Sequence, residues 1–177
     1  MIIERLARIA VTAFDVHRLA QHCRVDGAEY HSELNSLGLA AALELEAYAQ
    51  LALTNQPIRL TLDAWPNTAW LHLPIAPMID ALTVTVTNDG AAFADFAAVA
   101  GLRPAIRLTG NRPCGLIVVT YTAGFGADQR DVPADLVNAV MDQASALFDA
   151  KGEGDGKTNR MSPHMARVAA RYRRVAI

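Results

Sequence analysis

The spacing of apolar residues changes along the chain from a helical period to a strand period and back. Over residues 28–53, apolar side chains recur every three or four positions, which predicts one long amphipathic helix. Over residues 56–123, apolar and polar residues alternate instead, as they do in half-buried antiparallel strands. The helical spacing returns over residues 133–150. This order predicts an α+β fold, in which a small helical bundle carries an inserted small antiparallel β-sheet.

The most strongly specified stretch joins the last expected strand to the second long helix. Residues 116–122 are mostly β-branched and aromatic, and Gly124 and Gly126 then supply the positive φ angles that a sharp turn needs. Pro133 suits the first position of a helix, and Asp135 places a negative charge near the helix N-terminus. A strand, a glycine turn and a helix are therefore expected in that order.

Five short strands are expected within the alternating part of the chain. Their residues are 58–63, 69–73, 82–87, 105–108 and 116–122. Residues 88–90 (Asn-Asp-Gly) are a strong hairpin signal. The alanine-rich residues 91–102 fit neither period, so their structure is left open.

The N-terminal region carries weaker signals. Residues 1–12 fit a helical face and an extended arm equally well. Thr12 and Asp15, three positions apart, predict the cap of a short helix over residues 14–23.

A similar cap signal precedes the long helix. Asp26 is followed three positions later by Glu29, which predicts an aspartate cap with an acidic partner. Within the helix, Gly38 costs on the order of 1 kcal/mol relative to alanine, and three alanines follow it closely. The small residues there indicate the close approach of another helix.

The last part of the chain is expected to be separate from the folded domain. The domain itself is expected to span residues 1–150, with a helical part, a β insertion and a core helix at residues 1–55, 56–123 and 131–150. Residues 151–161 are rich in glycine and charge, which predicts a flexible linker. Ser162 and Pro163 then start a helix with one apolar face and several arginines. Residues 162–177 are therefore expected to form a detached docking helix and tail.

The composition narrows the class of protein. The chain has 177 residues and a formal net charge of −2, so no overall basic field indicates binding to nucleic acid or to an anionic membrane. Cys23 and Cys114 lie far apart, which favours buried free thiols in a reducing compartment over a disulfide. Charges interrupt the N-terminal apolar residues, and no run reaches the ~18 apolar residues of a spanning helix. We expect a soluble protein, cytoplasmic when it is made, with no membrane partner.

The sequence contains no clear catalytic, cofactor or metal motif. Gly124 and Gly126 invite comparison with a dinucleotide fingerprint, but Gln129 stands in place of the third glycine and the preceding strands are antiparallel by pattern. The five histidines have no metal-site spacing with one another or with the cysteines. The neighbours His22 and Cys23 point in different directions on a helix, which argues against a thiolate pair. We expect no cofactor, no metal and no enzymatic activity.

Several short motifs match a known family in their order and spacing. They are residues 22–26 (HCRVD), 60–66 (LTLDAWP), 73–77 (LPIAP), 119–126 (VTYTAGFG), 132–136 (VPADL) and 172–173 (YR). In this order they resemble the head–tail connector (adaptor, or head-completion) proteins of tailed phages and of gene transfer agents. Cys23 stands where that family usually has leucine, and Arg171 where it usually has proline.

The resemblance implies a structural protein in the neck of a virion or phage-like particle. Such a protein forms a ring, twelvefold in assembled particles, between the portal protein and the head-closure (stopper) or tail proteins, and double-stranded DNA passes through it. Since arginine and tyrosine are enriched at interface hot spots, we expect the C-terminal segment to bind the portal. The residues expected to do so are Arg167, Arg171, Tyr172, Arg173, Arg174 and Ile177. Acidic side chains on a helix face are expected to line the channel and repel the passing DNA.

Two alternative functions remain open at this stage. A small-ligand-binding or enzymatic domain would use the loop from Gly124 to Gly126 and would have a deep pocket beside it. Another neck protein, such as a tail terminator, would belong to the same general class. The early pair of helices and the basic tail favour the adaptor position over the tail terminator.

Overall fold

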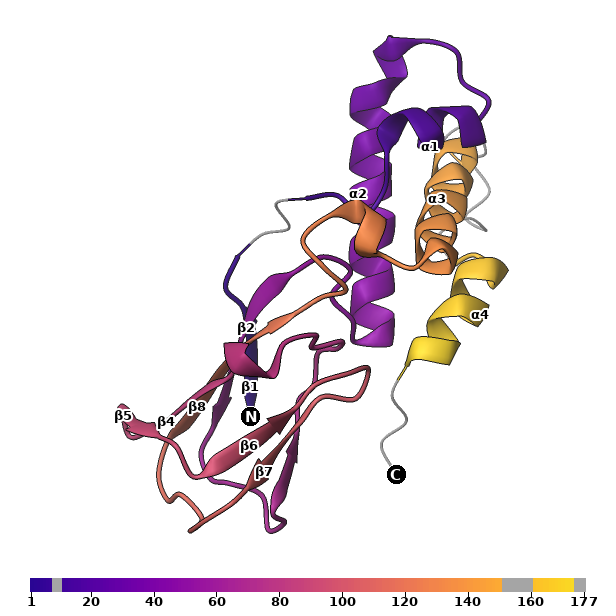
Figure 1. Ribbon diagram of the computed structural model, residues 1–177. Helices are drawn as coiled ribbons and strands as arrows, with labels where there is room; N and C mark the ends of the chain where they lie inside the picture. The colour runs from indigo at the N-terminus through magenta and orange to yellow at the C-terminus, as the bar shows by residue number, and fades with distance from the viewer. Residues whose placement is uncertain (8–10, 151–160, 174–177) are drawn as a thin grey trace.

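The computed structural model describes residues 1–7, 11–150 and 161–173, and it places helices at one end of the molecule and strands at the other (Figure 1). This arrangement confirms the expected α+β class. Within these residues the chain forms four α-helices, which are α1 (Val16–His22), α2 (His31–Ala49), α3 (Ala134–Asp149) and α4 (Pro163–Tyr172). Three 3-10 turns accompany them: η1 (Ala28–Tyr30), η2 (Ala81–Thr83) and η3 (Gln129–Asp131).

The helical bundle is built around α2 and α3, which lie side by side (Figure 1). Leu34 and Leu45 of α2 and Leu136 of α3 are fully buried in its core. Gly38 does mark a close approach, but the group that comes close is the ring of Phe14, just before α1. A Cβ at position 38 would fall on that ring, so glycine is needed there.

The long helix is shorter than predicted at both ends. Residues 28–30 form the 3-10 turn η1, and α2 begins at His31, with Gly27 and Tyr30 at the two N-cap positions. The predicted aspartate cap is therefore wrong. At the other end Gln50 adopts a left-handed conformation with φ of 56°, which ends α2 at Ala49. Residues 51–55, which include a bend at residues 53 and 54, then lead into the strand that starts at Gln56.

The N-terminal residues form a strand, not a helix. β1 (Ile2–Arg5) pairs antiparallel with β2 (Gln56–Leu62), so the extended arm was the correct alternative and residues 1–55 are not helical throughout. The cap of the first helix also differs from the prediction. Asp15 itself caps α1, since its side chain accepts hydrogen bonds from the backbone N–H groups of His17 and Arg18.

The β part contains two sheets, and the predicted single sheet of about five strands is wrong. The larger sheet has the order β1-β2-β8-β4-β5 and the smaller one β3-β7-β6, with every pair antiparallel. The remaining strands are β3 (Trp70–His72), β4 (Thr85–Asn88), β5 (Ala91–Phe93), β6 (Phe96–Val99), β7 (Ala105–Leu108) and β8 (Ile117–Ala123). Both sheets contribute to one apolar core, with Leu60, Leu71, Ile106 and Val119 fully or almost fully buried.

Two details of the strand prediction changed. The hairpin signal at residues 88–90 does join two strands, β4 and β5, so the unassigned alanine-rich stretch holds β5 and β6. The strand predicted over residues 82–87 starts only at Thr85, because the Asp80 side chain accepts a hydrogen bond from Leu82 and caps the turn η2. Leu82 is consequently 91% exposed instead of buried.

The C-terminal helix is packed against the bundle, so the prediction of a detached helix is wrong. Ser162 caps α4 by accepting a hydrogen bond from the backbone N–H of Met165 at 3.1 Å. Met165, Val168 and Ala169 are buried in the bundle core, which uses the apolar face of α4. The predicted linker, apart from Met161, and the last four residues of the tail lie outside the described residues.

Candidate interaction surface

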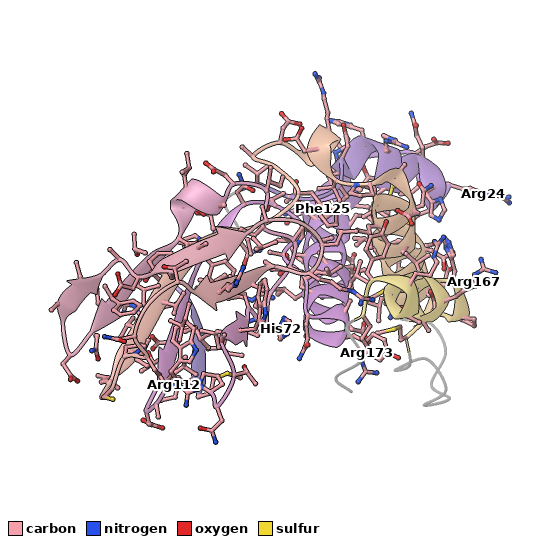
Figure 2. The ribbon with its side chains drawn as sticks, turned by 60° about the horizontal axis from the view of Figure 1, so that its bottom comes forward. Arg24, His72, Arg112, Phe125, Arg167 and Arg173 are labelled. Carbon is pink, nitrogen blue, oxygen red and sulfur yellow. The ribbon has the colours of Figure 1, made fainter. Side chains whose placement is uncertain are left out.

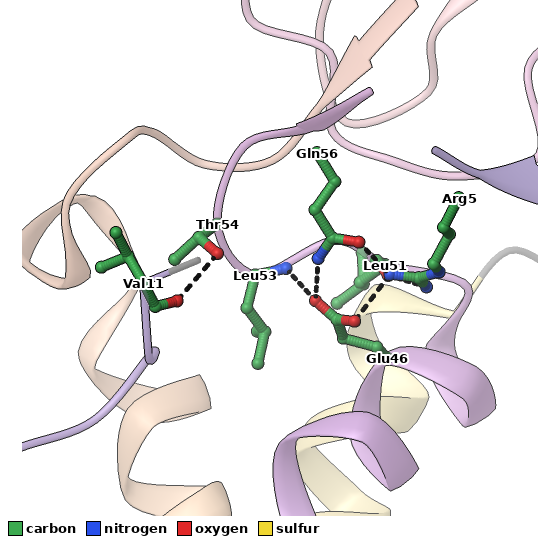
Figure 3. Close-up of polar contacts among 7 residues, drawn as sticks. All are labelled: Arg5, Val11, Glu46, Leu51, Leu53, Thr54 and Gln56. Carbon is green, nitrogen blue, oxygen red and sulfur yellow. Dashed lines mark hydrogen bonds and ion pairs between the residues drawn. The ribbon is translucent and has the colours of Figure 1, made fainter. Parts of the chain in front are cut away.

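A buried carboxylate fixes the junction between the bundle and the larger sheet (Figure 3). Glu46 of α2 is only 1% exposed, and it accepts hydrogen bonds from Arg5 at 2.6 Å, from the backbone N–H of Leu53 at 2.7 Å and from the Gln56 amide at 2.8 Å. Arg5 also donates to the Gln56 carbonyl oxygen at 2.7 Å and to the backbone oxygen of Leu51 at 2.8 Å. The network thus joins β1, α2 and the start of β2.

Burial dominates the electrostatics of this network. It raises the pKa of Glu46 above the ordinary value of 4.5, although the hydrogen bond from Leu53 and the charge of Arg5 act in the opposite direction. All the polar contacts of the carboxylate are satisfied within the chain, and the role of Glu46 is structural.

The glycine turn after β8 is a structural element as well. Gly124 has φ of 145°, and a Cβ there would lie 2.5 Å from the backbone of residues 54 and 55. Its N–H donates to the backbone oxygen of Pro77 at 2.8 Å, and the oxygen of Gly126 accepts from Asn55 at 2.8 Å. These groups tie the turn to the chain that enters β2, so they are not free to hold a phosphate.

Three of the residues predicted to bind a partner meet at the end of α4. The Tyr172 hydroxyl donates to the carboxylate of Asp135 in α3, at 3.0 Å and 3.1 Å from its two oxygens. Arg171 also pairs with Asp135 at 3.0 Å, and the guanidinium of Arg173 lies 5.0 Å from the centre of the Tyr48 ring. Burial and the neighbouring Asp135 raise the pKa of the Tyr172 hydroxyl.

These residues line a pocket of about 250 Å³, which we call the α4 pocket. It is lined by Leu51, Leu102, Arg103, Asp135, Arg171, Tyr172 and Arg173. Leu102 and Arg103 come from the loop between β6 and β7, so the pocket joins the β part to the bundle. Leu51 is buried, whereas Leu102 is 60% exposed.

The other predicted partner-binding residues are placed differently. Arg167 is exposed one turn before Arg171 on the outer side of α4, and it is not among the residues that line the pocket (Figure 2). Arg174 and Ile177 lie outside the described residues. Leu102 and Arg103 were missed by the sequence reasoning, because nothing in their local pattern connects them with a helix about seventy residues later.

The rest of the described chain offers little for chemistry. Among the described residues, no group of His, Cys, Asp and Glu side chains could hold a metal ion. None of the helices that the structure describes has the length and apolar character needed to span a bilayer. Both cysteines are free, but Cys114 is exposed and Cys23 only half-buried, so the expected burial of both thiols is wrong.

Comparison with known proteins identifies the class of the chain through its fold. No family model matches the sequence, and no curated protein matches it. A chain in the solved structure "Neck of empty GTA particle computed with C6 symmetry" is similar with a TM-score of 0.83 and 25% identity, covering 100% of this chain and 97% of that chain. A chain in "Virion of native gene transfer agent (GTA) particle" is similar with a TM-score of 0.82 and 26% identity, and the match covers the same shares of both chains.

A third solved structure, "Neck of native GTA particle computed with C12 symmetry", contains a similar chain with a TM-score of 0.76 and 26% identity, again over 100% of this chain. The likeness therefore extends over both the helical and the β part. It agrees with the motif resemblance found in the sequence. The chain is a neck protein of the head–tail connector class of tailed phages and gene transfer agents, a structural protein and not an enzyme.

Proposed function

We propose that the chain is the adaptor subunit of the neck. In this role it forms an oligomeric ring between the portal protein and the head-closure or tail proteins, and double-stranded DNA passes through the ring. The observation that carries the proposal is the full-length likeness to chains of gene transfer agent necks, two of which were computed with C6 and C12 symmetry. A twelvefold ring is compatible with both symmetries.

The surface of the chain suits lateral packing in a ring. All four residues of the edge strand β1 are exposed, and they include Ile2 at 61% and Ile3 at 41%. An exposed edge strand with apolar side chains is normally covered by another chain. Repeated contacts of this kind between unlike surfaces form a ring when the rotation from one subunit to the next is a whole fraction of a full turn.

The charge of the chain suits the passage of DNA. The formal net charge is −2, so the ring as a whole does not attract a polyanion. DNA that has to move through a channel is better served by acidic walls than by a basic surface, because counterion release makes basic surfaces hold DNA tightly.

The adaptor role is tested by assembling particles without this chain. We expect DNA-filled heads that carry no tails, and recovery of complete particles when the intact chain is supplied. Complete particles formed in its absence would contradict the proposal.

The contact with the portal is tested separately, with single arginine substitutions instead of a deletion. Removing residues 162–177 would expose the core that Met165 and Val168 cover, so loss of binding could reflect unfolding. Arg167→Glu and Arg173→Glu change exposed side chains and leave that core intact. We expect each to weaken capture by immobilised portal protein, whereas Arg112→Glu, an exposed arginine at the far end of the β part, should not (Figure 2). Equal capture of all three variants and the wild-type chain would refute the C-terminal contact.

A further inference from the structure

The α4 pocket opens beside a second, apolar hollow. That hollow has a volume of about 470 Å³ and is lined by residues 77–79, residues 100–102 and Phe125. Leu102 lines both cavities, and Phe125 packs edge to face on Tyr172 at 6.2 Å between ring centres. The two hollows are therefore one continuous surface, which we call the α4 groove.

The α4 groove combines exposed apolar side chains with a surplus of positive charge. Ile79 is 59% and Leu102 60% exposed, and neither is covered by the rest of the described chain. Three arginines, Arg103, Arg171 and Arg173, line the pocket, together with the single carboxylate of Asp135. Asp135 is already paired with Arg171, and Arg103 and Arg173 form no ion pair with other described residues.

We propose that the α4 groove docks an acidic peptide segment of a partner protein, with an apolar side chain of that segment in the hollow at Leu102 and its carboxylates on Arg103 and Arg173. A carboxylate matches the fork geometry of a guanidinium, and an exposed leucine beside a buried apolar floor needs an apolar side chain to cover it. The assignment rests on the proposed function, since a neck subunit has to contact other proteins of the particle.

The shape of the site favours a peptide over nucleic acid. Arg103 comes from the β6–β7 loop, whereas Arg171 and Arg173 come from the end of α4. They line one pocket together with Leu51 and Leu102, so they do not follow a single element as a stripe along a phosphate backbone would. Arg173 already covers the ring of Tyr48, so that ring cannot stack on a base from the same side.

The proposal can be tested on the free chain by nuclear magnetic resonance. The backbone amides are followed while acetyl-Glu-Asp-Leu-Phe-Asp-Glu-amide is added, and the titration is repeated with the uncharged acetyl-Gln-Asn-Leu-Phe-Asn-Gln-amide and with a short DNA duplex. We expect the acidic peptide to shift the amides of Leu102, Arg103, Arg171 and Arg173, and the uncharged peptide to bind at least about tenfold more weakly, the loss of one charge-assisted hydrogen bond.

Matched variants separate the groove from general charge effects. We expect Arg103→Glu and Arg173→Glu each to lower the affinity for the acidic peptide by about tenfold or more. Arg112→Glu makes the same change of charge far from the groove and should leave this affinity unchanged. Circular dichroism and thermal melting of the three variants establish that they are folded. Because the titration uses neither the portal nor an assembled ring, its result does not depend on whether the adaptor proposal is correct.

Several outcomes would overturn the inference. The first is that the acidic peptide leaves the groove amides unshifted. The second is that the uncharged peptide binds equally well, and the third is that the DNA duplex binds the same amides more tightly than the acidic peptide. Finally, sedimentation could show that Arg103→Glu or Arg173→Glu breaks up a self-associated form of the free chain. The occupant would then be a second copy of this chain, and the proposal would be wrong.

Discussion

Replacing Glu46 by alanine tests whether the junction between bundle and sheet depends on the buried network. The substitution removes an acceptor that three groups share: Arg5, the backbone N–H of Leu53 and the amide of Gln56 (Figure 3). The Leu53 and Gln56 donors are buried, and the structure offers them no replacement for the carboxylate oxygen to which they donate.

The expected cost follows from the burial of the two charged partners. Removing one member of a buried ion pair typically costs about 3–5 kcal/mol. The Arg5 side chain is 29% exposed and can turn toward water after the substitution, whereas the Glu46 side chain is 1% exposed. We therefore expect Glu46→Ala to lower the free energy of unfolding by about 3 kcal/mol, the lower end of that range.

An exposed glutamate–arginine ion pair provides the control for the buried pair of Glu46 and Arg5. Glu4 and Arg59 lie 3.9 Å apart, and their side chains are 52% and 47% exposed. Glu4→Ala should cost less than about 1 kcal/mol, as exposed ion pairs usually do. The assay is urea unfolding monitored by circular dichroism. The midpoints of the two variants are compared under the condition that the unfolding free energy depends equally on urea concentration in both. An equal midpoint for Glu46→Ala and Glu4→Ala would refute the role of the network.

The pH dependence of this difference adds an independent check. Burial holds the pKa of Glu46 above 4.5, so the folded protein binds the proton more tightly than the unfolded chain does. The stabilising contribution of Glu46 is then greatest below its unfolded pKa and decreases as the pH rises through its folded pKa. The stability gap between the wild-type chain and Glu46→Ala should therefore widen as the pH is lowered from neutral toward 4.5. A gap that narrows on acidification would contradict the assignment of burial as the dominant cause.

Three further substitutions test individual contacts by thermal or urea unfolding. Gly38→Ala should destabilise the fold by about 1–3 kcal/mol, more than its gain in helix propensity, because the new Cβ meets the ring of Phe14; a net gain in stability would contradict this. Tyr121→Phe should cost about 1–3 kcal/mol, because its buried hydroxyl bonds both the N–H and the oxygen of Ile75 at 3.0 Å, and an unchanged stability would refute that role. Gly124→Ala should cost about 3 kcal/mol or more, because φ of 145° and the nearby backbone both exclude a side chain; a variant that folds normally would disprove it.

The elements with strong local signals were predicted well from the sequence. The helix expected over residues 133–150 is α3 (Ala134–Asp149), because Pro133 marks its start and its apolar face is regular. The alternation in β8 was also clear, since Ile117, Val119, Tyr121 and Ala123 are all buried.

The arrangement of the strands could not be read from their patterns. Alternation shows that a strand has a buried face, but it does not say which strands pair. β2 pairs with β8, more than fifty residues later, and the intervening strands divide between two sheets. Local patterns also failed where a side chain changed the backbone, as Asp80 does by capping the turn that exposes Leu82.

Only part of the candidate interaction surface could be predicted from the sequence, because its remaining residues are brought there by the fold of a distant segment. Arg171, Tyr172 and Arg173 were recognised as an interface set because arginine and tyrosine gather at the end of one helix. Their partners in the pocket, Leu102 and Arg103, reach it only through the fold of the β6–β7 loop. The apolar face of α4 was also recognised from the sequence, but only the structure shows that this face packs against the helical bundle.

The most direct test of the proposed role in the neck is electron microscopy of the purified chain, alone and mixed with the portal protein of the same particle. Our account predicts a ring of this chain seated on the portal, with twelve subunits around the channel. Particles in which the portal carries no added ring, while the chain remains a compact monomer, would contradict it.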